Sequence, residues 1–422
     1  MRSFACALSI VLTFSGSLLA DGVIRNGLGA RVAGRGGTNI AFSDSGMILH
    51  DNPAGMINVA SNGLAELTGD LLITDIRYQE PTQFTSSDHD PVPLGNVALI
   101  HKTADDQLAV GLGFFSPGGF ATDYTMNAPA PFGGPTKYKS FGSLARALAG
   151  AAWQVDDRLS VGASLGVGIS HIELEGPYFL QGPSLPPGTP TIMDLQATGA
   201  ALSWSIGMQY AWTDATTIGA AFQGDTNFNL DGSTSTTVPG LGSSEFDTTL
   251  NMRWPMSLGL GLRHQLCRHR VVGIDAIWYD WSSAFDTAGM ELSNPSSPIY
   301  QQVLGTHITE NLPLQWRDSI SVRLGGEHHF DSGKTVRAGY VYHRNPIPSA
   351  TLTPYLNTTL EHTFALGYGQ PLWGGWQTDL AYQFMYGPKN TIEDSALAGD
   401  DFTGGVNYTY AHFIFVGFLK QF

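Results

Sequence analysis

Two stretches of the sequence carry residue types that could perform catalytic or metal chemistry. Gly162-Ala163-Ser164-Leu165-Gly166 matches the Gly-x-Ser-x-Gly pattern, which presents a serine nucleophile at a sharp strand-to-helix turn. His264, Cys267 and His269 lie close together, and imidazole and thiolate are good zinc ligands. Ser164 falls inside an alternating strand pattern, however, and the histidines fall at a predicted turn. We therefore expect no enzyme activity, no metal and no cofactor.

A third kind of chemistry is the recognition of a carboxylate by arginine, whose planar guanidinium can pair with both carboxylate oxygens. Arginines predicted to face inward from strands are Arg146, Arg253, Arg317, Arg323 and Arg337. The alternative role is ion pairing within the protein with Glu66, Asp70, Asp275, Glu327 and Asp379. We chose Arg253, Arg317 and Arg337 as carboxylate candidates, with the hypothesis that Arg253 or Arg317 contacts the ligand head group.

Strands must position these residues, and the clearest strand is the last one, Tyr408–Phe422. Its even positions are apolar with aromatic residues at both ends, which is typical of a transmembrane β-strand. Its other face is apolar too, where a water-filled pore would carry polar side chains. We therefore predict a partly hydrophobic lumen, with the candidate lining residues Phe115, Ile277, Tyr279, Trp281, Phe413 and Phe415.

The same two-residue alternation recurs from Gly63 to the end of the chain, which predicts strands throughout. We count fourteen strand-like segments, separated by short turns and long loops in turn. The long loops are expected near residues 80–94, 117–137, 178–192, 230–247, 286–311, 345–357 and 391–406. An even number of antiparallel strands with this loop pattern predicts an all-β, outer-membrane barrel with both termini in the periplasm.

Composition excludes several other classes of protein. The net charge of −15 gives no basic footprint for nucleic acid. No stretch after the first residues has about 18 uninterrupted apolar residues, so no helical membrane span is expected. Cys6 falls in the predicted signal peptide, so Cys267 has no internal disulfide partner.

The N-terminal region divides into two predicted segments. Residues 1–20 have Arg2, an apolar run and the small residue Ala20, which together predict a secretory signal peptide. Residues 21–62 do not alternate and are rich in Gly, Ala and Asn, which favours a compact, partly helical segment. The barrel is predicted to occupy residues 63–422.

Several motifs resemble those of the FadL-type outer-membrane transporters of long-chain fatty acids and aromatic hydrocarbons. Asn52-Pro53-Ala54, after the glycine-rich opening at residues 27–37, is similar to the N-terminal hatch of that family. Later stretches that fit are Trp254-Pro255-Met256-Ser257, Trp278-Tyr279-Asp280-Trp281-Ser282, Trp316-Arg317-Asp318, residues 335–340 and the terminal Phe422.

The resemblance implies a fourteen-stranded barrel plugged by residues 21–62, which takes up hydrophobic molecules by passive diffusion. Long-chain fatty acids are the first expectation for the cargo, with aromatic or other hydrocarbons as the alternative. The ligand would leave sideways where the third strand is kinked, with candidates Gly111, Gly113, Pro117 and Gly118; residues 117–119 could instead simply begin a loop. Outer-membrane lipid and lipopolysaccharide would surround a monomer, and the barrel-assembly machinery would recognise Phe422.

Three rival functions remain open at this stage. A general porin-like channel would use the same barrel for small polar solutes, although the apolar inner face and the plug argue against it. An outer-membrane hydrolase would be built around Ser164, and an adhesin would use the long loops.

Overall fold

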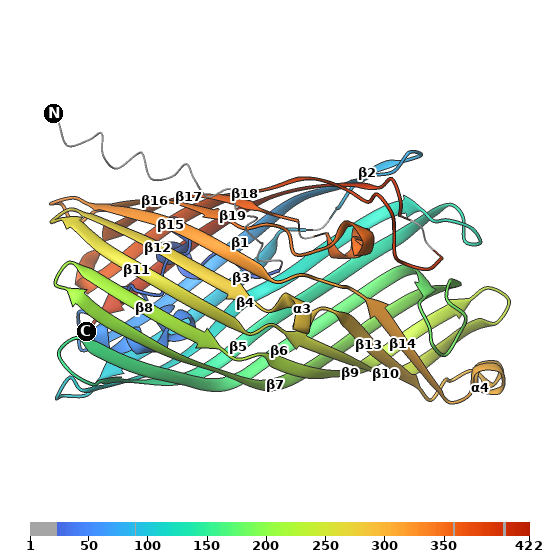
Figure 1. The fold of residues 1–422 in the computed structure, drawn as a ribbon, viewed down its shortest axis with the longest axis horizontal. Coiled ribbons are helices and arrows are strands. Elements are labelled where there is room, and N and C mark those ends of the chain that lie inside the picture. The colour runs from blue at the N-terminus through green and yellow to red at the C-terminus, as the bar shows by residue number, and fades with distance from the viewer. Residues whose placement is uncertain (1–22, 89, 358, 400–401) are drawn as a thin grey trace.

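The computed structural model describes residues 23–88, 90–357, 359–399 and 402–422. The predicted signal peptide, residues 1–20, lies outside the described residues. Within them, the chain forms one long antiparallel barrel (Figure 1). No helix among the described residues is long and apolar enough to cross a membrane.

The first half of the wall begins with single long strands. They are β1 (Gly63–Gln79), β3 (Val92–Lys102), β4 (Leu108–Asn127), β5 (Pro135–Gln154), β6 (Leu159–Leu180) and β7 (Thr189–Thr213). The short strand β2 (Phe84–Ser86) lies in the connection from β1 to β3 and pairs with β1.

Four wall strands in the second half are each interrupted once. They are β8 with β9 (Thr216–Gln223, Thr226–Val238), β11 with β10 (Ser257–Cys267, Gly242–Trp254), β12 with β13 (Arg270–Tyr279, Thr287–Ser293) and β15 with β14 (Ser319–His329, His307–Pro313). The wall ends with β16 (Thr335–Tyr342), β17 (His362–Pro371), β18 (Trp376–Thr391) and β19 (Val406–Gln421). When each interrupted pair is counted as one strand, the described residues make the predicted fourteen-stranded barrel, which is thereby confirmed.

Closure of the barrel comes from pairing between its first and last strands. β1 and β19 pair from Leu64↔Gln421 to Gln79↔Val406, so neither strand leaves an open edge. Apolar side chains on the outer face are exposed, as Leu67, Leu202 and Leu366 illustrate. This is the arrangement in which the outside of the wall contacts acyl chains.

Residues 23–62 lie in the interior of the barrel rather than in its wall, and we call residues 23–62 the inner segment. It contains α1 (Gly29–Gly34), α2 (Ile48–Asp51) and the 3₁₀ helix η1 (Pro53–Asn58). The inner segment is almost entirely buried, and the helices pack against β5, β6, β17 and β18. Figure 1 shows these blue helices in the half of the barrel that carries the short turns and the C-terminus.

The remaining helices lie in connections. α3 (Trp281–Ala284) interrupts the wall between β12 and β13, and α4 (Pro298–Leu304) joins β13 to β14 at the opposite end from the C-terminus (Figure 1). The 3₁₀ helices η2 (Ser349–Thr351) and η3 (Pro354–Leu356) follow β16, and η4 (Trp373–Gly375) is the turn between β17 and β18.

Several predicted loops prove to be strand. The predicted loop at 117–137 is mostly wall, because β4 runs on to Asn127 and β5 begins at Pro135. The predicted loop at 230–247 shrinks in the same way to the short connection between β9 and β10. Residues 230–247 are rich in Ser, Thr and Gly, and residues 117–137 in Pro and Gly, so composition alone resembled that of loops.

Candidate functional site

A mainly apolar space inside the barrel begins at the C-terminal end of α3, and we call it the outer cavity. Its volume is about 150 Å³. Its apolar lining includes Ile172, Leu195, Met252, Phe285, Met290 and Leu312, which come from β6, β7, β10, β13, β14 and the segment after α3. Strands distant in sequence meet here because the barrel brings their inward faces together.

The charges around the outer cavity are acidic. Among the described residues that line it, the charged ones are Glu173 and Glu310, and none is lysine, arginine or histidine. Glu310 accepts hydrogen bonds from the hydroxyl of Tyr178 at 3.1 Å and from the backbone N–H groups of Gln181 and Gly182. Both acidic groups are thus held by protein donors, since Glu173 pairs with Lys139 at 2.6 Å.

A second, more polar space lies between the outer cavity and the inner segment, and we call it the inner cavity. Its volume is about 70 Å³. Titratable residues that line it are Arg25, His50, Asp51, Arg146, Asp275, Tyr279 and Arg323. Most of these groups are paired: Arg25 with Asp70 at 2.6 Å, and Asp275 with the backbone N–H groups of Asn39 and Ile40.

Arg146 differs from the other arginines of the inner cavity. It is 3 % exposed, and its hydrogen-bonded side-chain partner among the described residues is Nε2 of His50, 3.3 Å from Nη1. Its Nε atom is buried without an acceptor among those residues. A buried cation without a carboxylate partner is costly, so Arg146 is the basic group of this cavity best placed to receive an anion.

The wall beside the inner cavity is interrupted at β4. The β3–β4 ladder ends at Val97↔Phe114, and the β4–β5 register shifts between Phe115 and Gly118. The predicted break at Pro117 and Gly118 is therefore present as a bulge within a strand that continues, not as the start of a loop.

The start of the inner segment fills the gap that this bulge leaves. Ile24 forms an isolated antiparallel bridge with Gly118. The Arg25 N–H donates to the Pro117 carbonyl at 2.9 Å, and the Gly119 N–H donates to the Val23 carbonyl at 3.0 Å. Residues 23–25 thus pair with β4 where β3 no longer does.

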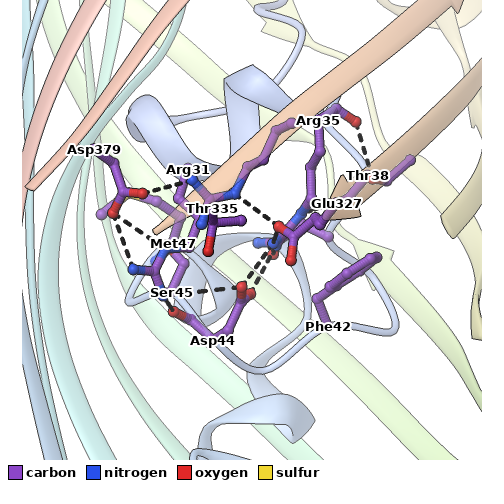
Figure 2. A network of polar contacts seen from close by, with 12 residues as sticks. Arg31, Arg35, Thr38, Phe42, Asp44, Ser45, Met47, Glu327, Thr335 and Asp379 are labelled. Atoms are coloured by element: carbon purple, nitrogen blue, oxygen red, sulfur yellow. Dashed lines mark hydrogen bonds and ion pairs between the residues drawn. The ribbon is translucent and has the colours of Figure 1, made fainter. Parts of the chain in front are cut away.

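A buried network of charges ties α1 and the following loop to the wall (Figure 2). Arg31 pairs with Asp379 at 2.9 Å, and Arg35 pairs with Asp44 at 2.8 Å and Glu327 at 2.9 Å. Arg337 completes the network through Glu327 and Asp379. All of these side chains are almost fully buried except that of Asp44, which is 34% exposed. Loss of one arginine would therefore leave the buried carboxylates less well compensated.

Asn52-Pro53-Ala54 fastens the other end of the inner segment. The Asn52 amide donates to the carbonyls of Ile40 at 2.7 Å and Met208 at 3.0 Å, and its oxygen caps η1 through the Ala54 N–H. A Cβ atom at Gly162 would lie 2.5 Å from the Ala54 nitrogen, so only glycine permits this approach.

The predicted lumen residues are inward, but most of them contact the inner segment or one another. Phe115 packs with His50, and Phe413 and Phe415 pack with Ala30 and Ala33 of α1. Ile277 and Tyr279 line the inner cavity, while Trp281 belongs to α3 and is fully buried. Gly111 also faces the inner segment, close to Met56, and Gly113 lies against Phe115.

Two of the three carboxylate candidates do not face the lumen. Arg253 lies on the exposed face of β10, opposite the buried Trp254, and bonds Asn227 at 2.6 Å. The wall is interrupted at Pro255-Met256, and this break reverses which face points inward between β10 and β11. Arg317 is exposed in the interruption between β14 and β15. The inward prediction is wrong for both.

Arg337, the third carboxylate candidate, is inward but paired with Glu327 and Asp379. The remaining candidates are the possible nucleophile Ser164 and the possible metal ligands His264, Cys267 and His269. The Ser164 hydroxyl lies 2.7 Å from that of Ser205 in mid-strand, which is not the turn that a nucleophile elbow needs. No group of three or more possible metal ligands occurs within the part of the chain that the structure describes.

Sequence reasoning missed the residues that matter most to the two cavities. Glu310 and the apolar residues of β13 and β14 fell in a predicted loop. Arg31 and Arg35 lay in a segment without periodicity, so no signal marked their partners. Arg146 was predicted to face inward. The residues that pair with it on the two neighbouring strands are not acidic, and the strand register would have shown this.

Comparisons with known proteins agree with this geometry. A family model described as "Outer membrane protein transport protein (OMPP1/FadL/TodX)" matches residues 11–413. No curated protein matches the sequence.

Solved structures share the fold at low sequence identity. The structure of a Pseudomonas aeruginosa FadL homologue has 18% identity and a TM-score of 0.77, covering 95% of this chain and 100% of that one. The Pseudomonas putida toluene transporter TodX has 20% identity and a TM-score of 0.78, covering 94% and 99%. The Ralstonia pickettii toluene transporter TbuX has 21% identity and a TM-score of 0.75, also covering 94% and 99%.

Proposed function

Since this chain belongs to the OMPP1/FadL/TodX family of outer-membrane transport proteins, we propose that its cargo is a small, uncharged hydrophobic molecule, such as a monoaromatic hydrocarbon. The chain is an outer-membrane transporter, and the observation that carries the choice of cargo is the outer cavity, with its apolar wall and acidic charges. Two of the structurally similar proteins are toluene transporters by name, which agrees with this proposal.

The size of the outer cavity supports a single-ring ligand. An engineered apolar cavity of about 150 Å³, lined by Leu, Ile and Phe, stays dry and binds benzene. The outer cavity has about the same volume and a similar lining. Burial of apolar area contributes about 25 cal/mol per Å², so a ring needs no polar contact to be held there.

The charge of the outer cavity argues against a carboxylate there. The charge of Glu173 is offset by Lys139, but an anion would still lie near Glu310 with no cation among the described lining residues, and like charges at close range disfavour binding. A neutral ligand experiences no such repulsion.

The proposed route runs from the outer cavity through the inner cavity to the gap beside β4. Residues 23–25 are the part of the inner segment that has to move, because they fill the gap through backbone hydrogen bonds and the Arg25–Asp70 pair. The charge network of Arg31 and Arg35 keeps the rest in place. The cargo then leaves sideways into the membrane by passive diffusion.

Binding measurements on the purified protein test the cargo. We expect toluene to bind with higher affinity than benzoate, which has the same ring and a negative charge. Leu312→Asp places a further carboxylate in the outer cavity and should abolish toluene binding, whereas Leu266→Asp, exposed beside the turn between β11 and β12, should not change it. Benzoate binding as tight as toluene binding would reject the proposal.

Long-chain fatty acids are a second candidate cargo, favoured by one observation. Arg146 is a buried cation without a carboxylate partner. A carboxylate head group that reached the inner cavity could pair with it while the acyl chain remained in the outer cavity. Arg146→Gln should then weaken the binding of a long-chain fatty acid and leave the binding of the matching alkane unchanged. Equal effects on both ligands would show that Arg146 has a structural role only.

A covalent crosslink across the gap tests whether the cargo leaves the barrel there. Ser116 donates its backbone N–H to Asn96 Oδ1 at 3.0 Å, so these residues face each other across the gap. In a Cys267→Ser background, Asn96→Cys with Ser116→Cys and a short thiol crosslinker should block uptake but not binding, and each single variant is the control. Uptake that persists after complete crosslinking would place the exit elsewhere.

A further inference from the structure

The four interruptions of the wall lie side by side. In the ladder, Ser257 pairs with both Gln223 and Tyr279, and Tyr279 pairs with Ser319. These residues are the ends of β8, β11, β12 and β15, so neighbouring strands are all broken at one level. Figure 1 shows α3 at this level, part-way along the barrel.

Each of the last three interruptions places large aromatic side chains inside the barrel. We call Trp254, Trp281, Phe285 and Trp316 the aromatic partition. Trp281 lies 5.1 Å from Phe285 and 5.0 Å from Trp316 between ring centroids, and Phe285 stacks on Trp316 at 4.7 Å. All four side chains are buried.

The aromatic partition separates the two cavities. The outer and inner cavities have no lining residue in common among the described residues. Phe285 lines the outer cavity and Trp254 lines the inner one, and their rings meet edge to face at 6.4 Å. A ligand that crosses the boundary between the cavities at this contact therefore requires the two rings to part.

Trp254 also contacts the gap in the wall. A Cβ atom on Gly118 would lie 2.9 Å from Cζ3 of Trp254 and 3.0 Å from the Val23 carbonyl oxygen. The indole ring, the bulge of β4 and the first residue of the inner segment are thus in direct contact. The indole N–H groups of Trp254 and Trp281 have no acceptor among the described residues, so no hydrogen bond holds either ring in its present orientation.

We propose that Trp254 and Phe285 form the selectivity gate of the transport path. A ligand passes when the Trp254 ring turns away from Phe285, and the same movement releases the contact of that ring with Gly118 and thereby loosens residues 23–25. The width that opens between two ring edges admits a flat, sparsely substituted ring more readily than a bulky one. This inference rests on the proposed uptake of neutral hydrocarbons.

Uptake of two radiolabelled hydrocarbons by cells that depend on this protein tests the gate. The measured quantity is the ratio of mesitylene uptake to toluene uptake, because mesitylene carries methyl groups all round the same ring. Trp254→Ala should raise this ratio about tenfold, the effect of a barrier lowered by about 1.4 kcal/mol. Trp254→Phe, which restores a ring, should return the ratio toward the wild-type value.

Phe246→Ala is the matched control. Phe246 is a buried aromatic residue of the same strand that lines neither cavity, so its truncation should leave the ratio unchanged. If Trp254→Ala fails to fold, as judged by the heat-dependent gel mobility of the barrel, Phe285→Leu removes the other half of the gate and should raise the ratio as well.

The outcomes separate the gate from the cargo. Wild-type protein that binds toluene, combined with folded Trp254→Ala or Phe285→Leu whose ratio is unchanged, overturns the gate and leaves the proposed function intact. Wild-type protein that binds no hydrocarbon overturns the proposed cargo itself. An equal rise in Phe246→Ala would show general loosening of the barrel and would also overturn the gate.

Discussion

At the scale of single residues, the inner cavity is notable for groups whose charge is set by burial. His50 lines it, 2.8 Å from Asp51 and 3.3 Å from Arg146. Burial lowers the pKa of His50 below its ordinary value of 6.5, despite the opposing effect of Asp51. His50 is therefore neutral in the closed protein at neutral pH, and the positive charge of Arg146 opposes its protonation.

Acidification should loosen the inner segment through His50. We call the protein closed when the inner segment is docked in the barrel and open when it is released. The pKa of His50 is lower in the closed state, so the open state binds the extra proton. The closed state therefore loses stability as the pH falls through 6.5. The loss is at most about 1.4 kcal/mol per pH unit for one proton. Hydrogen exchange of residues 23–58, measured on either side of that pH and with each rate divided by the intrinsic amide rate at the same pH, should be faster in acid.

His50→Gln is the control for this pH dependence. Glutamine does not titrate, so the acid-induced increase in exchange should be smaller in this variant. The Asp275 and Asp51 carboxylates also lie in the inner cavity and remain in the variant. An unchanged pH dependence would show that His50 is not the group responsible.

At the scale of elements, α1 is the part of the inner segment that the charge network holds. Arg35 is fully buried, bonds Asp44, Glu327 and Asn39, and lies 3.9 Å from the ring of Phe42. A helix of six residues has too few internal hydrogen bonds to be stable alone. Its position therefore depends on these contacts with the wall.

Arg35→Ala should release α1 from the wall. Its loss leaves the buried Glu327 with Arg337 as its remaining arginine and removes a pair from the partly exposed Asp44. The cost should therefore be smaller than the about 3–5 kcal/mol of a fully buried charge left without a partner. Limited proteolysis should then cleave the inner segment much faster while the barrel stays folded. Arg77→Ala, which breaks an exposed pair with Asp75 on β1, should behave like the wild type; equal cleavage in both variants would contradict this account.

At the scale of the whole molecule, the barrel depends on an unbroken apolar outer face. Leu366, on β17, is 64% exposed and lies between the outward Phe364 and the partly exposed Tyr368. This position is typical of the lipid-facing middle of a strand. Lipopolysaccharide contacts, recognition of Phe422 by the assembly machinery and the monomeric state stay predictions.

Leu366→Arg should destabilise the barrel by about 2–4 kcal/mol, because a charge at the middle of the bilayer loses its hydration. Urea unfolding in lipid vesicles measures the change. Trp373→Arg, in the exposed turn between β17 and β18, is the matched substitution at the membrane edge and should cost much less. Equal losses at the two positions would show that residue 366 is not in the bilayer core.

The sequence alone determined the class of this protein and the order of its parts. Period-two alternation is local, so it marks strands and outward faces wherever a strand is unbroken, as in β6 and β19. The motif Asn52-Pro53-Ala54 marked the inner segment because its residues act together. The Asn52 oxygen caps η1 through the Ala54 N–H, and Ala54 packs closely against Gly162.

The tertiary structure alone decided what faces the lumen and what is paired there. Pro255-Met256 shifts the phase by breaking the strand, so Trp254 points inward and Arg253 outward, and no local rule says how far a break turns the chain. Asp379 and Glu327, the wall partners of Arg31 and Arg35, lie hundreds of residues away in the sequence, and His50 lies 96 residues from Arg146. The apolar cavity likewise exists only because closure of the barrel brings together side chains from strands that never meet in the sequence.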